Sequence, residues 1–180
     1  ILDLGCGTGE IALALSEKGW NVVGCDISKN MLAQAQLRDG ADKVEWCCID
    51  IDDKGIYPFQ DQSFDIITAS SVLEYIDNPR DCLSECYRML KPKGYILLTI
   101  PDERHPVRIK ESHLSNKLFS QIKHLVRFLM HHSLRTDYYR YSISRHTPNA
   151  WCNLIADCKF VHGPIGPCKE PLLMLVAQKL

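Results

Sequence analysis

Short apolar runs alternate with amphipathic stretches along the chain up to residue 101. The runs hold four to six residues, as buried strands do, and the stretches between them repeat apolar residues at helical spacing. The predicted strands are 1–4, 21–25, 44–49, 64–69 and 95–100, and the predicted helices are 10–18, 28–37 and 79–90. Strands and helices that alternate in this way indicate βαβ units, a parallel sheet and an α/β fold.

The pattern changes after residue 101. We expect 102–145 to form a helical insertion or lid, with a basic amphipathic helix at 114–135. That helix has two interpretations: a lid whose basic side faces water, or a surface that also contacts an anionic membrane. A helix capped by Thr147, followed by strands at 159–162 and 172–178, is predicted to complete the fold.

Composition indicates an ordinary globular protein. The chain of 180 residues is 46% hydrophobic and 24% charged, which predicts one domain, 1–180. A net charge of -1 leaves no overall electrostatic footprint for nucleic acid, so no nucleic-acid partner is expected. The nine cysteines form no CxxC pair and favour reduced thiols in a cytoplasmic protein without a metal site. Because the chain begins at Ile1 inside a strand pattern, we expect truncation at the N-terminus.

A glycine-rich segment, residues 3–9 (DLGCGTG), joins the first predicted strand to the first helix. Glycines at such a turn let the backbone approach a ligand closely, and several nucleotide-binding folds use them. A dinucleotide fingerprint, GxGxxG, would place its third glycine at position 10, where this chain has Glu10. A carboxylate at that helix N-terminus repels a pyrophosphate, so the loop favours a ligand with positive groups and no phosphate.

Three acids follow successive predicted strands: Asp3, Asp26 and Asp50. Asp26 occupies the place where mononucleotide-binding units hold ribose hydroxyls, and Asp50 is placed to face an adenine. Each acid alone is equally explained as an ordinary strand-end or capping residue. Their recurrence after a glycine loop, at the edge where open α/β sheets bind ligands, favours a nucleoside site.

These motifs resemble those of the class I S-adenosylmethionine-dependent methyltransferases. The similar stretches are 1–9, Asp26-Ile27, 48–50, 64–67 and 90–95. The resemblance implies a doubly wound, Rossmann-like sheet of seven strands, mostly parallel with the last strand antiparallel and the helical insertion after strand five. It also implies S-adenosylmethionine as the cofactor, which carries an ammonium and a sulfonium but no phosphate.

Carried over residue by residue, the resemblance implies which positions hold the cofactor. Asp3, Gly5, Gly7 and Gly9 would cradle the methionine end. Asp26 would bind ribose, Ile27 would pack on adenine and Asp50 would bind the adenine amino group. The remaining cofactor-binding candidates are Cys6, Met31, Ile51 and Ser70.

Candidates on the acceptor side are Glu74, His105 and His146. Glu74 follows the fourth strand and is either a base or a first-turn helix acid. Each histidine is poised near neutral pH as a base, or is an ordinary surface or structural residue. Ubiquinone-pathway O-methyltransferases look similar, but their Glu-x-x-Glu-His motif is replaced here by residues 71–75 (SVLEY), so no metal is predicted.

The sequence therefore predicts an enzyme that moves a methyl group to an oxygen or nitrogen atom of a small organic acceptor. A lid at 114–135 that contacts an anionic membrane or admits an apolar molecule would fit a lipophilic acceptor. A catalytically inactive, methyltransferase-like binding subunit is the alternative. A nucleotide-dependent oxidoreductase is disfavoured by Glu10.

Overall fold

A single mixed sheet forms the centre of the computed structural model, which describes residues 1–51, 56–114, 142–166 and 168–180. The strand order is β3-β2-β1-β4-β5-β7-β6. The strands are β1 (Leu2–Leu4), β2 (Val22–Asp26), β3 (Val44–Cys48), β4 (Phe64–Ser70), β5 (Leu90–Pro101), β6 (Phe160–His162) and β7 (Leu172–Lys179). The helices are α1 (Glu10–Glu17), α2 (Lys29–Gln36), α3 (Pro79–Met89), α4 (Pro106–Leu114) and α7 (Pro148–Asp157), with short 3-10 turns η1 (Ala41–Lys43) and η2 (Leu73–Tyr75).

Strand directions confirm the predicted doubly wound sheet. Strands β1 to β5 pair in parallel, and β7 runs antiparallel to both of its neighbours, β5 and β6. The order reverses between β1 and β4, so the chain winds outward in two directions from this point. Open α/β sheets bind ligands at such a switch point, at the C-terminal ends of the strands.

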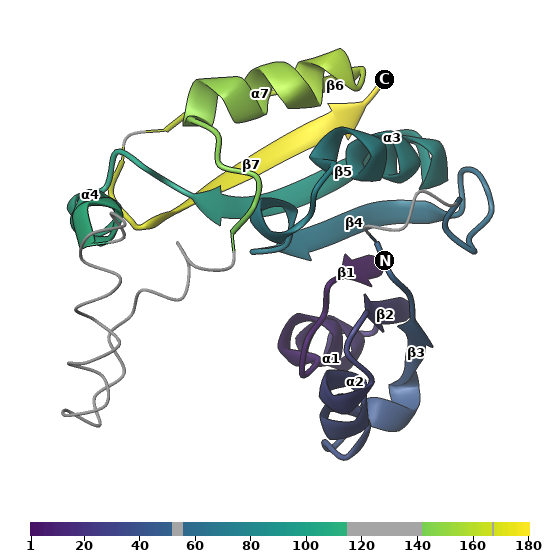
Figure 1. Ribbon diagram of the computed structural model, residues 1–180. Helices are drawn as coiled ribbons and strands as arrows, with labels where there is room; N and C mark the ends of the chain where they lie inside the picture. The colour runs from purple at the N-terminus through teal and green to yellow at the C-terminus, as the bar shows by residue number, and fades with distance from the viewer. Residues whose placement is uncertain (52–55, 115–141, 167) are drawn as a thin grey trace, which may run out of the picture.

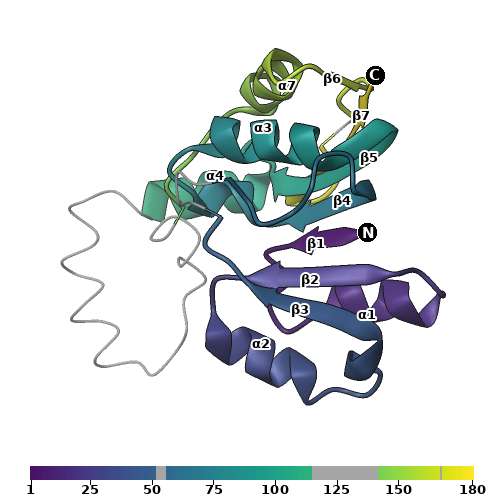
Figure 2. The same cartoon turned by 90° about the vertical axis from the view of Figure 1, so that its right-hand side faces the viewer.

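The helices form a layer on each side of the sheet (Figure 1). Helices α1 and α2 pack on β2 and β3, while α3 contacts β5 and α7 contacts β6. Because parallel crossovers are right-handed, winding in two directions places these helix pairs on opposite faces. Figure 2 shows α1 and α2 beside β2 and β3, with α3 and α7 at the other end of the sheet.

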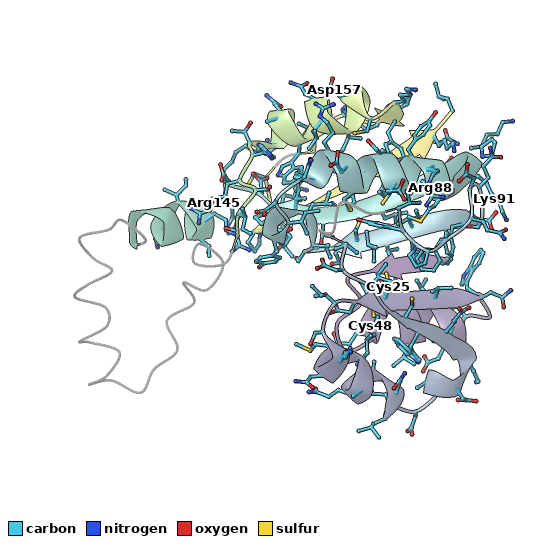
Figure 3. All side chains as sticks on the ribbon, turned by 45° about the vertical axis from the view of Figure 1, so that its right-hand side comes forward. Cys25, Cys48, Arg88, Lys91, Arg145 and Asp157 are labelled. Carbon is cyan, nitrogen blue, oxygen red and sulfur yellow. The ribbon has the colours of Figure 1, made fainter. Side chains whose placement is uncertain are left out.

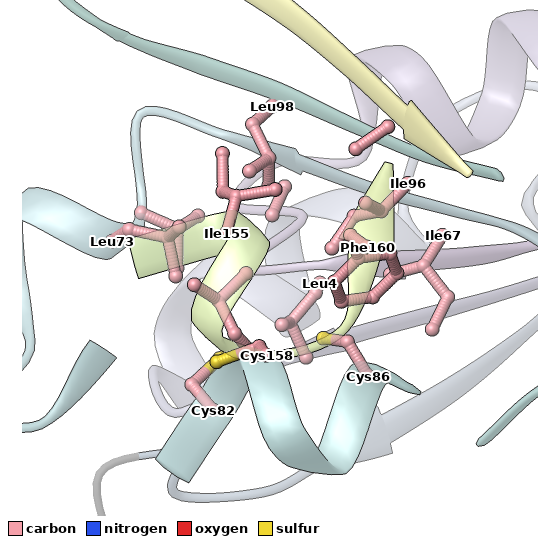
Figure 4. Close-up of a cluster of buried hydrophobic side chains, with 14 of the residues drawn as sticks. Leu4, Ile67, Leu73, Cys82, Cys86, Ile96, Leu98, Ile155, Cys158 and Phe160 are labelled. Carbon is pink, nitrogen blue, oxygen red and sulfur yellow. The ribbon is translucent and has the colours of Figure 1, made fainter. Parts of the chain in front are cut away.

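The main hydrophobic core lies between the sheet and the α3–α7 layer (Figure 4). Its strand residues include Leu4, Ile67 and Ile96, all fully buried. Ile155 of α7 and Cys86 of α3 cover them from the helix side, each at most 1% exposed. Burying a side chain of this size stabilises the fold by about 1.5–3 kcal/mol, so this layer carries much of the stability.

Local signals define most element boundaries. The Ser28 hydroxyl accepts the Met31 amide at 3.3 Å and caps α2, and the Thr147 hydroxyl accepts the Ala150 amide at 3.3 Å and caps α7. Pro79 opens α3, where the missing amide costs no hydrogen bond. These positions agree with the helix starts predicted from the sequence.

Strand β5 begins earlier than predicted. We expected residues 91–94 (KPKG) to separate α3 from a strand at 95–100, but β5 starts at Leu90, directly after the helix. Buried Leu90 pairs with Phe64 before a register shift in β4, and Lys93 takes a φ of 65°. The β4 register pairs Leu90 with Phe64 and next Tyr95 with Ile66, so residues 91–94 bulge out of the ladder, as their proline and glycine predict.

The segment after β5 is helical where the structure describes it. Helix α4 precedes the helix expected at 114–135, which lies outside the described residues except for Leu114. None of the described helices is long and apolar enough to cross a membrane. All nine cysteines are free thiols, and five of them are buried.

Candidate functional site

The glycine loop turns sharply between β1 and α1. Gly5, Gly7 and Gly9 have φ angles of 68°, 54° and 79°, in the left-handed region that favours glycine. The Cys6 amide donates to the Cys25 carbonyl at 2.9 Å, and the Gly9 amide donates to the Cys6 carbonyl at 2.9 Å. These bonds fasten the loop to the end of β2 and start α1 at Glu10.

The three glycines serve different purposes. A Cβ on Gly5 would lie 2.4 Å from Val72 Cγ2, and one on Gly9 would lie 2.5 Å from the Trp46 ring. A Cβ on Gly7 would meet nothing within 4 Å. Gly5 and Gly9 are thus required by packing within the protein, whereas Gly7 leaves open space beside the loop that a ligand can use.

Asp26 ends β2 directly beside this loop. Its carboxylate accepts the Gly7 amide at Oδ2 and the Ser28 amide at Oδ1, both at 2.8 Å. Because two backbone amides fix the carboxylate, its orientation is set before any ligand arrives. Each oxygen keeps a further lone pair that can accept a ribose hydroxyl.

Asp3 is a buried acid on β1, only 2% exposed. Its Oδ1 accepts the Thr68 hydroxyl at 2.7 Å, while Oδ2 has no hydrogen-bond partner among the described residues. Burial raises the pKa of Asp3 to about 6, although the Thr68 hydroxyl and the Ala12 amide lower it. An unpaired buried oxygen is costly, and a ligand ammonium would satisfy it.

Apolar side chains are exposed on the α2 side of Asp26. Ile27 is 60% exposed and Met31 is 43% exposed, where a flat ring can pack on them. The Ile49 amide donates to the Asp26 carbonyl at 3.2 Å and brings the end of β3 to this place. Exposed Asp50 and half-buried Ile51 follow it. Cys25 and Cys48 are labelled on these two strands in Figure 3.

Cys6 lies within the loop as a neutral thiol. Burial, together with the charges of Asp3 and Asp26, raises the pKa of Cys6 to about 12. This coupling places the thiol near both acids. A thiol held neutral in this way is a poor nucleophile, and its contact with a cofactor stays a prediction.

The end of β4 turns toward the glycine loop. Ser71 adopts a φ of 53°, and its amide donates to the Thr99 carbonyl and to Thr99 Oγ1, both at 3.0 Å. The Ser70 hydroxyl pairs with Thr99 Oγ1 at 2.8 Å. This left-handed turn leads into Val72, which packs on Gly5, and so brings η2 beside the loop.

Glu74 lies in η2 and is only 1% exposed. Its Oε2 has no hydrogen-bond partner in the described part of the chain. Burial raises the pKa of Glu74 to about 7, while its own amide and the Arg108 charge lower it. The Glu74 carbonyl accepts the amides of Ile143 and Ser144 at 2.8 and 3.1 Å, so the C-terminal end of the segment expected as an insertion is held here.

The two histidine candidates make structural contacts. His105 Nδ1 accepts the Val107 amide at 3.3 Å, and the His105 carbonyl accepts the Ile109 amide at 3.1 Å, so His105 caps α4. The His146 ring packs edge to face on buried Trp151, with centroids 4.8 Å apart. Their assignment as catalytic bases stays a prediction.

Sequence reasoning missed the groups that hold the candidate acids in place. Thr68 lies opposite Asp3 in the β1–β4 register, and Ile143 and Ser144 come from a distant segment. The alternation of side chains in β4 was a usable signal for Thr68. No local pattern in the sequence points to Ile143 or Ser144.

The first part of the chain is similar in sequence to known methyltransferases. Residues 2–98, more than half of the chain, match the protein family described as "Methyltransferase domain". A demethylmenaquinone methyltransferase of Clavibacter sepedonicus is 42% identical over 99 residues, which cover 54% of this chain and 39% of that protein. A ubiquinone biosynthesis O-methyltransferase of Pseudomonas entomophila is 31% identical over 99 residues, covering 55% and 43%. The chain thus spans about two fifths of the length of these relatives.

Solved structures share the whole fold. A methyltransferase from Thermotoga maritima, described as S-adenosylmethionine-dependent and a possible histamine N-methyltransferase, superposes with a TM-score of 0.72 at 17% identity, covering 99% of this chain and 81% of that one. An S-adenosylmethionine-dependent methyltransferase from Mesorhizobium loti has a TM-score of 0.71 at 16% identity, covering 99% and 89%. The family match and the shared fold together show that the chain belongs to the methyltransferase domain family.

Proposed function

We propose that this protein transfers a methyl group from S-adenosylmethionine to a small lipophilic acceptor that carries a ring hydroxyl. The observation that carries the proposal is the edge formed by the glycine loop, Asp3 and Asp26 in a chain of the methyltransferase domain family. The names of its relatives, which act in ubiquinone and menaquinone biosynthesis, support the choice of acceptor class.

The residues at this edge fit the proposed cofactor. The bare Oδ2 of Asp3 suits an ammonium, and the fixed carboxylate of Asp26 suits two ribose hydroxyls. Exposed Ile27 and Met31 suit the adenine ring, and the space beside Gly7 lets the backbone approach the ligand. The bound cofactor supplies a methyl group on a positively charged sulfur, which is already an activated leaving group.

The chain's own contribution is to orient the acceptor and to take up a proton. We assign this role to Glu74, because its buried Oε2 lacks a partner and η2 lies beside the glycine loop. A base is most effective when its pKa lies near the working pH, and burial raises the pKa of Glu74 to about 7. Hydroxyl deprotonation assists methylation of that oxygen and of the ring carbon beside it.

The site favours an enzyme over the inactive binding subunit, since the acids and glycines expected for cofactor binding are in place. The sequence predicts an oxygen or nitrogen acceptor atom. The relatives include an O-methyltransferase and a C-methyltransferase from Desulfotalea psychrophila, 37% identical over 97 residues, covering 52% of this chain and 38% of that protein. Mass spectrometry of the product identifies the atom.

Calorimetric titration with S-adenosylmethionine tests the cofactor, with Asp26→Ala as the matched variant. We expect the wild type to bind, and the variant to lose about a hundredfold in affinity because charge-assisted hydrogen bonds are removed. Transfer of a labelled methyl group to a panel of catechols and hydroquinones then tests the acceptor class. Folded wild-type protein that binds no cofactor, or that methylates none of the panel, contradicts the proposal.

A further inference from the structure

Thr68 on β4 contacts the buried carboxylate of Asp3. It is the cross-strand neighbour of Asp3 in the parallel β1–β4 pair. Its hydroxyl lies 2.7 Å from Asp3 Oδ1 and 3.5 Å from the Leu2 carbonyl. The shorter distance shows that the single hydroxyl proton is donated chiefly to the carboxylate.

The surroundings of Asp3 otherwise oppose its negative charge. Burial raises its pKa, and the nearby carboxylate of Asp26 raises it further. The Cys6 and Cys25 thiols also lie within electrostatic range of Asp3 and bring no positive charge. The groups that favour the ionised form are the Thr68 hydroxyl and the Ala12 amide of α1. Thr68 is therefore the side chain that supports the charge.

The same bond also selects which oxygen remains available. Thr68 occupies Oδ1, and Oδ2 is left buried without a partner among the described residues. A carboxylate held by one oxygen cannot rotate freely, so the other oxygen is presented in one direction. Such prior ordering reduces the entropy lost when a ligand binds.

We propose that Thr68 is a positioning residue for the amino-acid end of the cofactor, holding Asp3 ionised and turned so that Oδ2 receives the ligand ammonium. The inference rests on the proposed function, because it takes S-adenosylmethionine and its product as the ligands. It predicts that Thr68 matters for ligands with an amino-acid tail and not for the adenosine part.

Two thioethers separate these effects: S-adenosylhomocysteine, which carries the tail, and methylthioadenosine, which lacks it. Thr68→Val keeps the branched shape that suits a strand and removes the hydroxyl. At pH 7 we expect its affinity for S-adenosylhomocysteine to fall about tenfold, as for loss of a hydrogen bond to a charged group. Its affinity for methylthioadenosine should stay at the wild-type value. Thr68→Ser retains the hydroxyl and should restore binding.

The pH profile gives a readout that a purely structural role would not move. An ammonium binds the ionised carboxyl, so wild-type affinity for S-adenosylhomocysteine should decline as the pH falls through about 6, the pKa of Asp3. In Thr68→Val the midpoint should move toward neutral pH, because a stabilising donor is lost. Methylthioadenosine should show no such midpoint in either protein.

Further variants keep the test decisive if Thr68→Val folds poorly. Asp3→Asn removes the charge and should reproduce the selective loss, and adding Thr68→Val to it should cause no further loss. Ser16→Ala deletes another buried hydroxyl, one that donates to the Leu13 carbonyl within α1, and serves as the control.

Two outcomes distinguish the proposals. If Thr68→Val binds S-adenosylhomocysteine as tightly as the wild type does, with the same pH midpoint, the role of Thr68 is overturned. The proposed function then still stands, because the wild type binds the ligand. Wild-type protein that binds neither thioether instead removes the proposed function.

Discussion

The two sides of the switch point hold their acids in different ways. On the β1–β3 side, Asp26 is fixed by amides that lie 19 and 2 residues away in the sequence. On the β4–β5 side, the segment around Glu74 is held by Ile143 and Ser144, which lie at the C-terminal end of the segment expected as an insertion. Among the described residues each side also keeps one unpaired carboxylate oxygen, Asp3 Oδ2 on β1 and Glu74 Oε2 in η2, whereas both Asp26 oxygens are bonded.

Under the proposed function the two sides have different tasks. A shared cofactor needs one fixed set of contacts, and bonds at the ends of neighbouring strands supply it: backbone amides hold Asp26, and the Thr68 hydroxyl holds Asp3. An acceptor differs from one enzyme to another, and long-range contacts allow its surroundings to change without disturbing the loop. Figure 3 shows the separation, with Cys25 and Cys48 on β2 and β3 and Arg145 in the segment that contacts Glu74.

The largest expected effect concerns the acceptor side alone. Glu74→Gln keeps the shape of the side chain and removes its ability to take up a proton. We expect kcat to fall about a hundredfold or more, as for loss of a general base. The cofactor Kd should not change. In the wild type kcat should rise with pH through about 7 as Glu74 ionises, and the variant should lack this step.

Glu74→Asp is the control, because it keeps the carboxylate but shortens the side chain by one methylene group. Comparing the two variants separates loss of the base from loss of its position. If Glu74→Gln retains full turnover, the acceptor side needs no base at this position and the contrast between the two sides disappears.

The glycine loop offers a second test, on the cofactor side. Gly9→Ala forces a Cβ to within 2.5 Å of the Trp46 ring at a φ of 79°. We expect the free energy of unfolding to drop by about 3 kcal/mol, from overpacking and backbone strain together.

Gly7→Ala is the matched change, since its Cβ meets nothing within 4 Å. It should cost only about 1 kcal/mol of stability, from its positive φ. Cofactor affinity should nevertheless fall, because the methyl group fills the space beside the loop. Urea unfolding and calorimetry measure both quantities, and equal destabilisation by the two changes would contradict the division of roles among the glycines.

A third prediction uses the stability of the acceptor side. Burial raises the pKa of Glu74 from its ordinary 4.5 to about 7, so the folded state prefers the neutral form. Stability contributed by this group is present below the unfolded pKa and is lost as the pH rises through about 7. Glu74→Gln should therefore be more stable than the wild type at pH 8, by about 3 kcal/mol. Denaturant midpoints at pH 5 and 8 check this, and a variant that is less stable at both values would refute it.

The smallest effect is expected at His105, next to the acceptor side. His105→Ala removes the acceptor of the Val107 amide and should cost about 1 kcal/mol as a lost helix cap. His105→Asn should restore the stability because its side-chain oxygen can accept the same amide. Turnover that falls far more than stability in both variants would instead identify the ring as a catalytic base.

Much of the cofactor side was readable from the sequence because its determinants are local. The glycine spacing fixes the turn of residues 3–9, and Asp26 follows a short β-branched strand. The absence of a third glycine at Glu10 argued correctly against a dinucleotide. Helix caps at Ser28 and Thr147 were equally local and were confirmed.

The tertiary structure alone decided three features. Buried Leu90 pairs with Phe64 on the far side of the bulge at residues 91–94, which extends β5 back to the end of α3. The parallel register set Thr68 opposite Asp3, so the Thr68 hydroxyl donates to the buried carboxylate. The segment at Ile143 and Ser144 bonds to the Glu74 backbone, and burial of the Glu74 side chain in the fold raises its pKa. The sequence determined the positions that turn, cap and alternate, whereas desolvation and cross-strand contact arise only when distant segments meet.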